Sequence, residues 1–216
     1  MADCPVCERG ALVSFQTVQS QHYLRCPECQ ATVMAEACRL SADQERAIYD
    51  FHENEADPGY RRFLSKLAEP LLARLTPGQQ GLDFGCGPGP VLAEMLTEAG
   101  MAVSLYDPFF HPSTDALARQ YDFVACTEVV EHLHQPARVF RQLDGLLKPG
   151  GWLGVMTCFQ TDDSRFANWH YRRDPTHVVF YREHTLAVIA GQLGWSLSVP
   201  RKDVALFQKP VTARPA

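Results

Sequence analysis

Two pairs of cysteines near the N-terminus have the spacing of a metal site. Cys4 and Cys7 form one C-x2-C pair, and Cys26 and Cys29 form a second. Each tight C-x2-C turn directs two thiolates at one ion, and the separation of the pairs is typical of four-cysteine zinc sites. We therefore expect a structural zinc on these four cysteines. A redox pair, a disulfide pair and a rubredoxin-like iron site are the alternatives.

The residues between the cysteine pairs predict a hairpin, because apolar and polar residues alternate in LVSFQTV and in HYLRC. Some 30 residues contain too little apolar surface to fold unaided, so metal binding would supply the folding energy. The basic residues Arg9 and Arg25 are outweighed by Asp3, Glu8 and Glu28. A ribbon without a basic stripe favours a protein-contact or lid role over nucleic-acid binding.

A second stretch, GLDFGCGPGP at residues 81–90, predicts a strand that breaks into a ligand-binding turn. It differs from the dinucleotide fingerprint G-x-G-x-x-G, because Pro90 stands where the third glycine would be. It is not a phosphate-binding P-loop either, because no Gly-Lys-Ser/Thr follows. Gly85, Gly87 and Gly89 would let a ligand approach the backbone where a Cβ atom would clash.

The elements around this turn alternate between strand and helix. Strands are predicted at residues 80–84, 101–107, 123–126 and 152–159, helices at 60–75, 91–100, 136–151 and 183–195, and a closing pair of strands at 196–210. This order predicts an α/β fold with a doubly wound, mostly parallel sheet, an antiparallel C-terminal edge and ligand sites at the carboxyl ends of the strands. We expect a zinc ribbon at 1–38, a helical cap or linker at 39–78 and the α/β domain at 79–212.

The segment LDFGCGPG resembles motif I of the class I S-adenosylmethionine-dependent methyltransferases. The resemblance covers about residues 80–160 and includes Asp107 at the end of the second strand, YDFVACTEVVEHL and LLKPGGWLGV. It implies a methyltransferase that uses S-adenosylmethionine. By the same resemblance the glycines meet the methionine part of the cofactor, Asp83 its amino group and Asp107 the ribose hydroxyls. The full set of expected cofactor-binding residues is Asp83, Gly85, Cys86, Gly87, Gly89, Asp107, Pro108, Phe109, Thr127, Glu128 and Val129.

One departure from the family pattern follows Asp107. Only a short segment separates it from Asp122, too little for the helix and third strand whose polar end usually holds adenine. We expect a truncated crossover. Stacking of Phe109 or Phe110 on the adenine ring is the substitute hypothesis, and plain core packing of these rings is the slightly favoured alternative.

Residues 161–186 are expected to face the transferred methyl group. Their motif DPTHVVFY resembles a segment of many small bacterial methyltransferases. Methyl transfer requires positioning of the acceptor and removal of a proton, which suits a histidine. His177 is the first candidate base and His132 the second, and the alternative is that these histidines are packed and bonded to the backbone. For Glu131 and His132, capping of a helix N-terminus is as well supported as a direct role. The arginines of this segment are expected either to clamp an anionic acceptor or to be solvated: Arg165, Arg172, Arg173 and Arg182.

Residues 41–56 and 60–75 predict two helices before the glycine turn. The favoured interpretation is that they cover one edge of the sheet. The alternative is that Tyr49, His52, Asn54 and Tyr60 cap the ligand pocket.

The bulk composition narrows the function. The chain has 216 residues, 46% hydrophobic and 21% charged, with a net charge of −5, and no apolar run long enough to cross a membrane. Without a signal-peptide pattern a cytoplasmic protein is expected. The acidic chain disfavours nucleic acid and favours a small-molecule acceptor, with the arginine cluster suggesting an anionic one. The alternatives are an RNA or protein methyltransferase that uses the ribbon for recognition, and a non-catalytic cofactor-binding module that docks on a protein partner.

Overall fold

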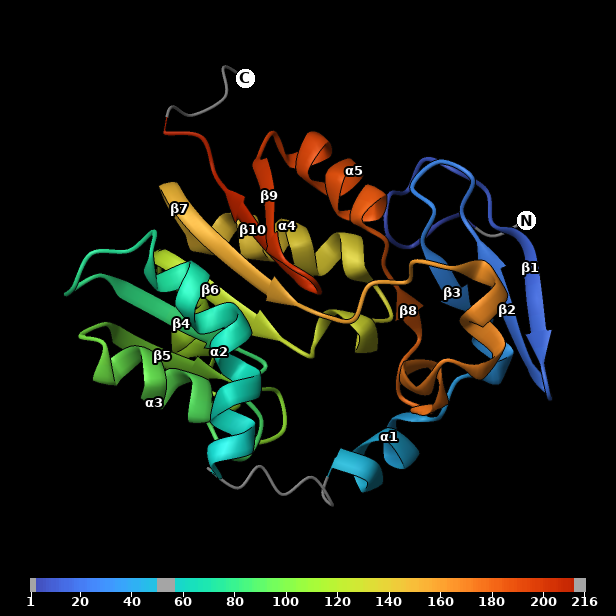
Figure 1. The fold of residues 1–216 in the computed structure, drawn as a ribbon, viewed down its shortest axis with the longest axis horizontal. Helices are drawn as coiled ribbons and strands as arrows, with labels where there is room; N and C mark the ends of the chain where they lie inside the picture. Colours follow the sequence, from blue (N-terminus) through green and yellow to red (C-terminus); the bar gives the residue numbers. More distant parts are fainter. Residues whose placement is uncertain (1–2, 50–56, 212–216) are drawn as a thin grey trace.

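A six-stranded sheet forms the centre of the molecule (Figure 1). The computed structural model describes residues 3–49 and 57–211. The strand order is β5-β4-β6-β7-β10-β9. The strands are β4 (Gln80–Phe84), β5 (Ala102–Tyr106), β6 (Tyr121–Thr127), β7 (Leu147–Met156), β9 (Ser196–Arg201) and β10 (Val204–Gln208). The first four strands of this order pair in parallel, and β10 is antiparallel to β7 and β9. The predicted fold class is therefore confirmed.

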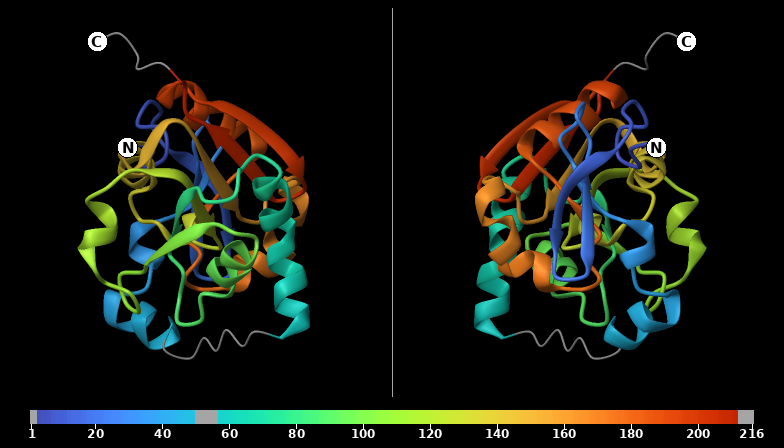
Figure 2. Two further views of the ribbon diagram at one scale, coloured as in Figure 1. Left: turned by 90° about the vertical axis from the view of Figure 1, so that its left-hand side faces the viewer. Right: turned by 90° about the vertical axis from the view of Figure 1, so that its right-hand side faces the viewer.

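Helices cover both faces of this sheet (Figure 2). They are α2 (Pro58–Leu72), α3 (Val91–Glu98), α4 (Pro136–Leu146) and α5 (Glu183–Leu193). Successive side chains of a strand point to opposite faces. In β6, Phe123 accordingly packs into the core under α2 and α3, whereas its neighbour Val124 packs into the core under α4 and α5.

The predicted helix at 136–151 is shorter than expected. Helix α4 ends at Leu146, and residues 147–151 already belong to β7. Pro149 explains the difference, since a proline cannot join a helix interior and biases the preceding residue, Lys148, toward an extended conformation. Gly150, with φ of 79°, then turns the chain.

The segment between β5 and β6 contains one short 3-10 helix at Thr114–Leu117 and, among its described residues, neither an α-helix nor a further strand. The truncated crossover is confirmed, and β5 is an edge strand of the sheet. The chain leaving β5 turns back on itself, where Asp107 and His111 exchange two backbone hydrogen bonds of 3.0 Å.

A second, four-stranded sheet contains the N-terminal residues (Figure 2, right). Its order is β1-β2-β3-β8, with β1 (Val13–Val18), β2 (Gln21–Arg25), β3 (Thr32–Met34) and β8 (Val179–Phe180). The hairpin of β1 and β2 was predicted. The fourth strand was not, because β8 comes from the segment that follows β7. The domain boundaries at residues 38 and 78 stay predictions.

The helices before the glycine turn begin with side-chain caps. Helix α1 (Ala42–Tyr49) follows Ser41, whose backbone N–H donates to Gln44 and whose hydroxyl accepts from the Gln44 N–H. Asp57 accepts from two backbone N–H groups of α2, so Asp57-Pro58-Gly59 starts helix α2. Residues 50–56, with the predicted helix end, His52 and Asn54, lie outside the described residues. No described helix is long and apolar enough to span a membrane.

Candidate active site and cysteine cluster

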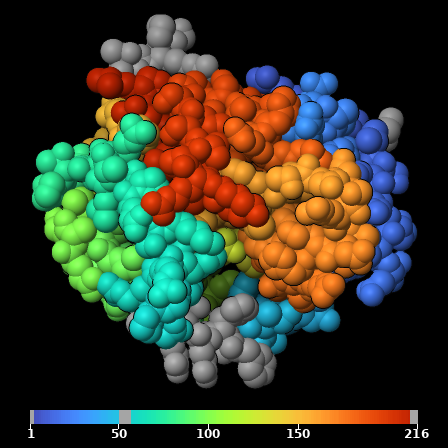
Figure 3. All heavy atoms as spheres, in the orientation of Figure 1, coloured from blue at the N-terminus to red at the C-terminus, as the bar shows by residue number. Residues whose placement is uncertain are grey.

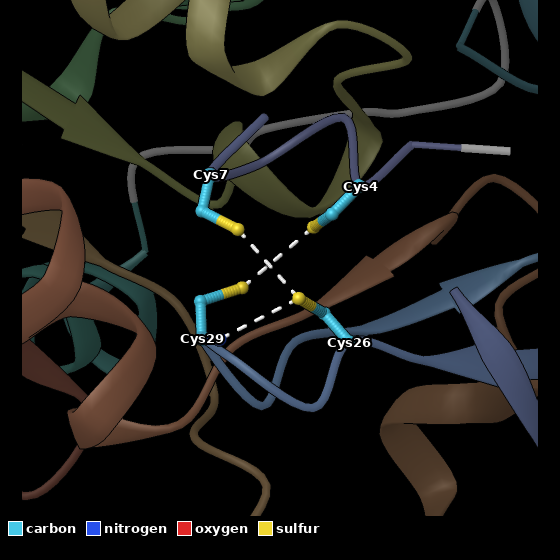
Figure 4. Close-up of side chains that lie close together, drawn as sticks. All are labelled: Cys4, Cys7, Cys26 and Cys29. Atoms are coloured by element: carbon cyan, nitrogen blue, oxygen red, sulfur yellow. Dashed lines mark hydrogen bonds between the residues drawn. The ribbon is translucent and has the colours of Figure 1, made fainter. Parts of the chain in front are cut away.

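The four N-terminal cysteines converge on one point (Figure 4). All four are buried, and their sulfur atoms lie within 4.8 Å of one another. The Cys4 and Cys29 sulfurs are 3.7 Å apart, and those of Cys7 and Cys26 are 3.6 Å apart. A tetrahedral ion with Zn–S bonds of about 2.3 Å places sulfurs about 3.8 Å apart, whereas a disulfide requires about 2.05 Å. The cluster is consistent with a zinc site and not with disulfides.

The two C-x2-C turns have the same local conformation. Glu8 and Gln30, each directly after the second cysteine of its pair, take positive φ values of 55° and 61°. Their backbone N–H groups donate to the carbonyl oxygens of Cys4 and Cys26, each over 2.9 Å. The repeated turn aims both pairs inward, as the sequence spacing predicted.

A cavity of about 740 Å³ lies at the carboxyl ends of β4, β5 and β6, a size typical of small-molecule sites. Figure 3 shows the surface hollowed between α2, in teal, and the segment after β7, in orange. The cavity is lined by every residue expected to bind the cofactor and by both candidate bases: Asp83, Gly85, Cys86, Gly87, Gly89, Asp107, Pro108, Phe109, Thr127, Glu128, Val129, His132 and His177.

The glycine turn is tied to the end of β5. Gly85 has φ of 77°, and a Cβ atom there would lie 2.4 Å from Val129. Gly87 donates its N–H to the Asp107 carboxylate over 3.0 Å. The other oxygen of that carboxylate accepts from the N–H groups of Phe109 and Phe110. Three backbone donors thus fix the orientation of Asp107 beside the turn.

Asp83 is 3% exposed at the end of β4. Burial raises its pKa to about 7, and the charge of Asp107 contributes in the same direction. A buried carboxyl group of this kind gains from a cation in the cavity.

The two candidate bases face each other, with ring centroids 4.7 Å apart. His177 Nδ1 is 2.7 Å from the carbonyl oxygen of Tyr171, and His132 Nδ1 is 3.2 Å from that of Thr176. Since a carbonyl only accepts, each Nδ1 carries a hydrogen, and each neutral ring has its lone pair on Nε2. Burial lowers the pKa of His177, which favours its neutral form.

The buried carboxyl group of Glu131 lies next to these two histidines. Glu131 is fully buried, and the Tyr171 hydroxyl donates to its Oε1 over 2.5 Å. Its Oε2 has no hydrogen-bond partner among the described residues. Burial raises its pKa. Glu131, His132 and His177 together place potential ligand atoms within 4.8 Å of one another. The described structure has no side-chain cap at the 3-10 helix Val130–His132 or at α4, so it does not support helix capping, the alternative for Glu131 and His132.

Glu128 lies on the cavity surface in a left-handed conformation, with φ of 53°. Such a backbone is costly for a residue with a side chain and is often found at functional sites. Burial raises the pKa of Glu128 to about 8, and the nearby charge of Glu131 adds to the shift.

Of the two alternatives for the arginines, a clamp on the acceptor or solvated side chains, the described structure does not support the clamp. Arg182 pairs with Asp163, Arg165 lies 3.7 Å from Asp162, and Arg172 bonds to the ribbon. None of the four candidate arginines lines the cavity as described. Arg165 and Arg182 of this segment lie in ion pairs, and Arg172 contacts the ribbon.

Sequence reasoning missed part of the cavity. Tyr49 and Tyr60 line it, in agreement with the less favoured interpretation of the two N-terminal helices. Tyr171 and Asp174 also line it. Both lie within six residues of His177, and this closeness in sequence to the candidate base could have identified them. Phe109 is 41% exposed, contrary to the favoured core packing of that ring.

The sequence of residues 55–198 matches the family profile described as a methyltransferase domain. Among curated proteins, the ubiquinone biosynthesis O-methyltransferase of Albidiferax ferrireducens is 35% identical over 37% of this chain and 41% of its own length. That of Erwinia tasmaniensis is 27% identical over 67% of this chain and 58% of its own length. The chain spans less than half of the first curated relatives that it matches.

Solved structures share the fold. The Burkholderia thailandensis 1,6-didemethyltoxoflavin-N1-methyltransferase, solved with 1,6-didemethyltoxoflavin and S-adenosylhomocysteine, has a TM-score of 0.53 and 18% identity, over 88% of this chain and 99% of its own. Magnesium protoporphyrin IX methyltransferase from Synechocystis has a TM-score of 0.51 and 18% identity, over 77% and 93%. With the matched profile, the glycine turn and Asp107, these findings show that the chain belongs to the class I S-adenosylmethionine-dependent methyltransferase family.

Proposed function

We propose that this methyltransferase methylates a small molecule that is neutral or positively charged where it enters the cavity, with His177 as the base. The observation that carries the proposal is the hydrogen bond of His177 Nδ1 to the Tyr171 carbonyl. It leaves Nε2 as the proton acceptor in the same cavity as the glycine turn.

The donor side of the cavity fits S-adenosylmethionine, which supplies a methyl group on a positively charged sulfur. The turn at Gly85 and Gly87 leaves no room for a Cβ atom at Gly85 and would receive the methionine part. The raised pKa of Asp83 suits a carboxyl group that meets the cofactor's ammonium group. Asp107, already oriented by backbone donors, would accept the ribose hydroxyls. The exposed ring of Phe109 would stack on adenine.

Proton removal from the acceptor would fall to His177. Its Nε2 lies 3.7 Å from Asp174, and the charge of Glu131 also favours its protonated form. These carboxylates would stabilise the imidazolium once the proton has arrived. His132 remains the second candidate.

The charges of the cavity argue against an anionic acceptor. Its lining includes five carboxyl groups and neither lysine nor arginine: Glu45, Asp83, Asp107, Glu128 and Asp174. Residues 50–56, which lie outside the described structure, contain no lysine or arginine in their sequence. The raised pKa values of Asp83 and Glu128 leave these two groups partly protonated near neutral pH, but no cationic side chain in the described lining would offset the charge of a carboxylate or phosphate. The same argument disfavours an RNA substrate, and the cavity volume of about 740 Å³ supports a small acceptor.

The first experiment is identification of the acceptor. The protein is incubated with a metabolite extract and S-adenosylmethionine that carries a labelled methyl group, and labelled products are identified by mass spectrometry. We expect a small neutral or cationic product. A labelled product whose acceptor carries carboxylate or phosphate groups would refute the charge assignment.

The identified acceptor then tests the base. His177→Asn keeps a donor for the Tyr171 carbonyl and removes Nε2, so we expect kcat/KM to fall about 10²–10⁴-fold, the usual contribution of a general base. S-adenosylhomocysteine should bind with nearly unchanged affinity. The matched control is His22→Asn on the exposed ribbon hairpin, which should leave both quantities unchanged. Full activity of His177→Asn would remove it as the base.

A further inference from the structure

The ribbon contributes to the catalytic geometry through its contacts with residues 169–178, hereafter the acceptor wall, which carry Tyr171 and His177. We propose that metal binding by the four cysteines holds the acceptor wall in place, with Arg172 as the positioning residue that joins the two. The inference rests on the proposed role of His177, but its structural test does not require that role to be right.

The first connection is the backbone around β8. Strand β3 of the ribbon pairs with β8, opposing Thr32 to Phe180 and Val33 to Val179. Val178, the residue directly after His177, accepts from the Met34 N–H over 2.8 Å and donates its own N–H to the Glu131 carbonyl over 2.8 Å. The chain next to the candidate base is therefore held between the ribbon and the turn that carries Glu131.

The second connection is the Arg172 side chain, which is buried. Its Nη1 donates to Gln21 Oε1 over 2.9 Å and to the Tyr23 hydroxyl over 3.2 Å, both on β2. Its Nε and Nη2 donate to the Ala167 carbonyl. Arg172 directly follows Tyr171, so this fork fixes the backbone whose carbonyl orients His177.

Aromatic packing supports the same contact. The Tyr23 ring of β2 lies 4.8 Å from Phe166 and 6.0 Å from Phe180, measured between ring centroids. Trp169, at the start of the acceptor wall, lies 5.7 Å from Phe180 and 5.3 Å from Tyr171. A continuous apolar core thus runs from the ribbon sheet to the cavity.

The cysteine cluster controls this arrangement because Cys26 and Cys29 lie in the connection between β2 and β3. The Cys26 N–H donates to the Ala31 carbonyl across this turn. A metal ion bound to the four thiolates would fix the turn, and through it the pairing of β3 with β8. Without the ion, four buried thiols have no common ligand to hold them, and the pairing loses its support.

The cofactor side of the cavity is built from other elements. The glycine turn and Asp107 follow β4 and β5, which lie on the side of the sheet remote from the ribbon in Figure 1. The contacts that orient Asp107 are made within residues 87–110. Loss of metal should therefore affect the acceptor wall while cofactor binding persists.

The first test removes the metal from the full-length protein with a chelator under reducing conditions, with metal content measured by elemental analysis. Amide hydrogen exchange is then compared between the loaded and stripped protein, and S-adenosylhomocysteine binding is measured by calorimetry. We expect exchange in residues 169–181 to rise at least about tenfold, while the dissociation constant changes by less than about threefold.

Three results would overturn the proposal. Unchanged exchange in 169–181 would make the ribbon an independent appendage. If cofactor binding and the exchange protection of β4 and β6 were both lost, the stripped protein would be generally unfolded. If elemental analysis found far less than one metal ion per chain in the purified protein, metal binding could not hold the acceptor wall in place.

The second test leaves the cysteines intact and compares Arg172→Met with the exposed neighbour Arg173→Met. The NMR titration of His177 reports the geometry around its ring, independently of any acceptor. We expect a shifted titration and faster exchange in the acceptor wall for Arg172→Met, and wild-type behaviour for Arg173→Met. With the acceptor identified, KM should rise for Arg172→Met alone. A wild-type His177 titration in Arg172→Met would refute its positioning role. If His177→Asn were fully active, the proposed base would fail while the exchange results still decided this inference.

Discussion

Tyr171 donates its hydroxyl hydrogen to Glu131 Oε1 over 2.5 Å, inside the protein and next to the cavity. The Tyr171 hydroxyl also lies 3.0 Å from that of Thr157, and its backbone carbonyl accepts from His177. One residue therefore donates to one oxygen of a buried carboxyl group with its side chain and contacts the candidate base with its backbone carbonyl. Tyr171 thus connects Glu131 to the proposed base.

Tyr171→Phe should separate these two roles, because it removes the hydroxyl and keeps the backbone. It leaves the Glu131 side chain without its observed donor, which should cost about 1–3 kcal/mol of folding free energy. The thermal midpoint should therefore fall. The value of kcat should fall as well, because Glu131, whose charge favours protonated His177, has lost its hydrogen-bond donor. The control is Tyr181→Phe, whose buried hydroxyl donates to the Val130 carbonyl and which is not among the described residues that line the cavity. Equal losses of kcat in the two variants would contradict a special link between Tyr171 and the reaction.

Much of the fold was predictable because local signals and the overall pattern agreed. The alternation of strands and helices, the glycine turn and Asp107 correctly predicted the parallel sheet and one cavity at its strand ends. The short segment after Asp107 likewise predicted the truncated crossover correctly. These features depend on residues close to one another in sequence.

The missed features depend on residues far apart in sequence. Val179 and Phe180 form a two-residue strand whose partner lies near the N-terminus, and so short a strand has no periodicity to detect. For Arg172 the sequence left a clamp on the acceptor and a solvated side chain as alternatives, and its buried contact with the ribbon was neither of them. Its partners Gln21 and Tyr23 are some 150 residues away.

Gly85→Ala should abolish cofactor binding. The new Cβ atom would lie 2.4 Å from Val129, and the φ of 77° is strained for alanine. We expect no measurable S-adenosylhomocysteine binding by calorimetry and a lower thermal midpoint. Gly191→Ala is the matched control, because a Cβ atom there meets nothing within 4 Å inside α5. It should stabilise the protein by about 0.5–1 kcal/mol. Normal binding by Gly85→Ala would place the cofactor elsewhere.

Phe109→Ala tests adenine stacking. Because the ring is 41% exposed, its removal should hardly change the thermal midpoint of the free protein. Loss of a stacked contact worth about 0.5–1.5 kcal/mol should weaken S-adenosylhomocysteine binding by roughly 2- to 12-fold. Methionine alone, which lacks adenine, should not distinguish the variant from the wild type. An unchanged affinity for S-adenosylhomocysteine would assign adenine to another surface.

The pH dependence of the reaction should report His177. A base works in its neutral form, and burial lowers the pKa of this histidine from its ordinary value of 6.5. We therefore expect kcat/KM to rise with pH through a value below 6.5 and then to level off. His177→Asn should lose this step, whereas His22→Asn should keep it. A step that persists in His177→Asn would assign the titration to another group, with His132 the next to test.

Glu128→Gln should stabilise the free protein in alkaline solution. Burial raises the pKa of Glu128 from 4.5 to about 8, so the folded protein holds a proton that the unfolded chain releases above pH 4.5. Its contribution to stability is therefore present at low pH and is lost as pH rises through about 8. Glutamine is neutral at every pH and keeps the shape, so denaturant unfolding should show a gain of about 1–3 kcal/mol at pH 8.5 and little difference at pH 4.5. The strained backbone at residue 128 is retained in the variant, which isolates the charge as the cause. Equal differences at both pH values would mean that packing, and not the buried carboxylate, limits stability at this edge of the cavity.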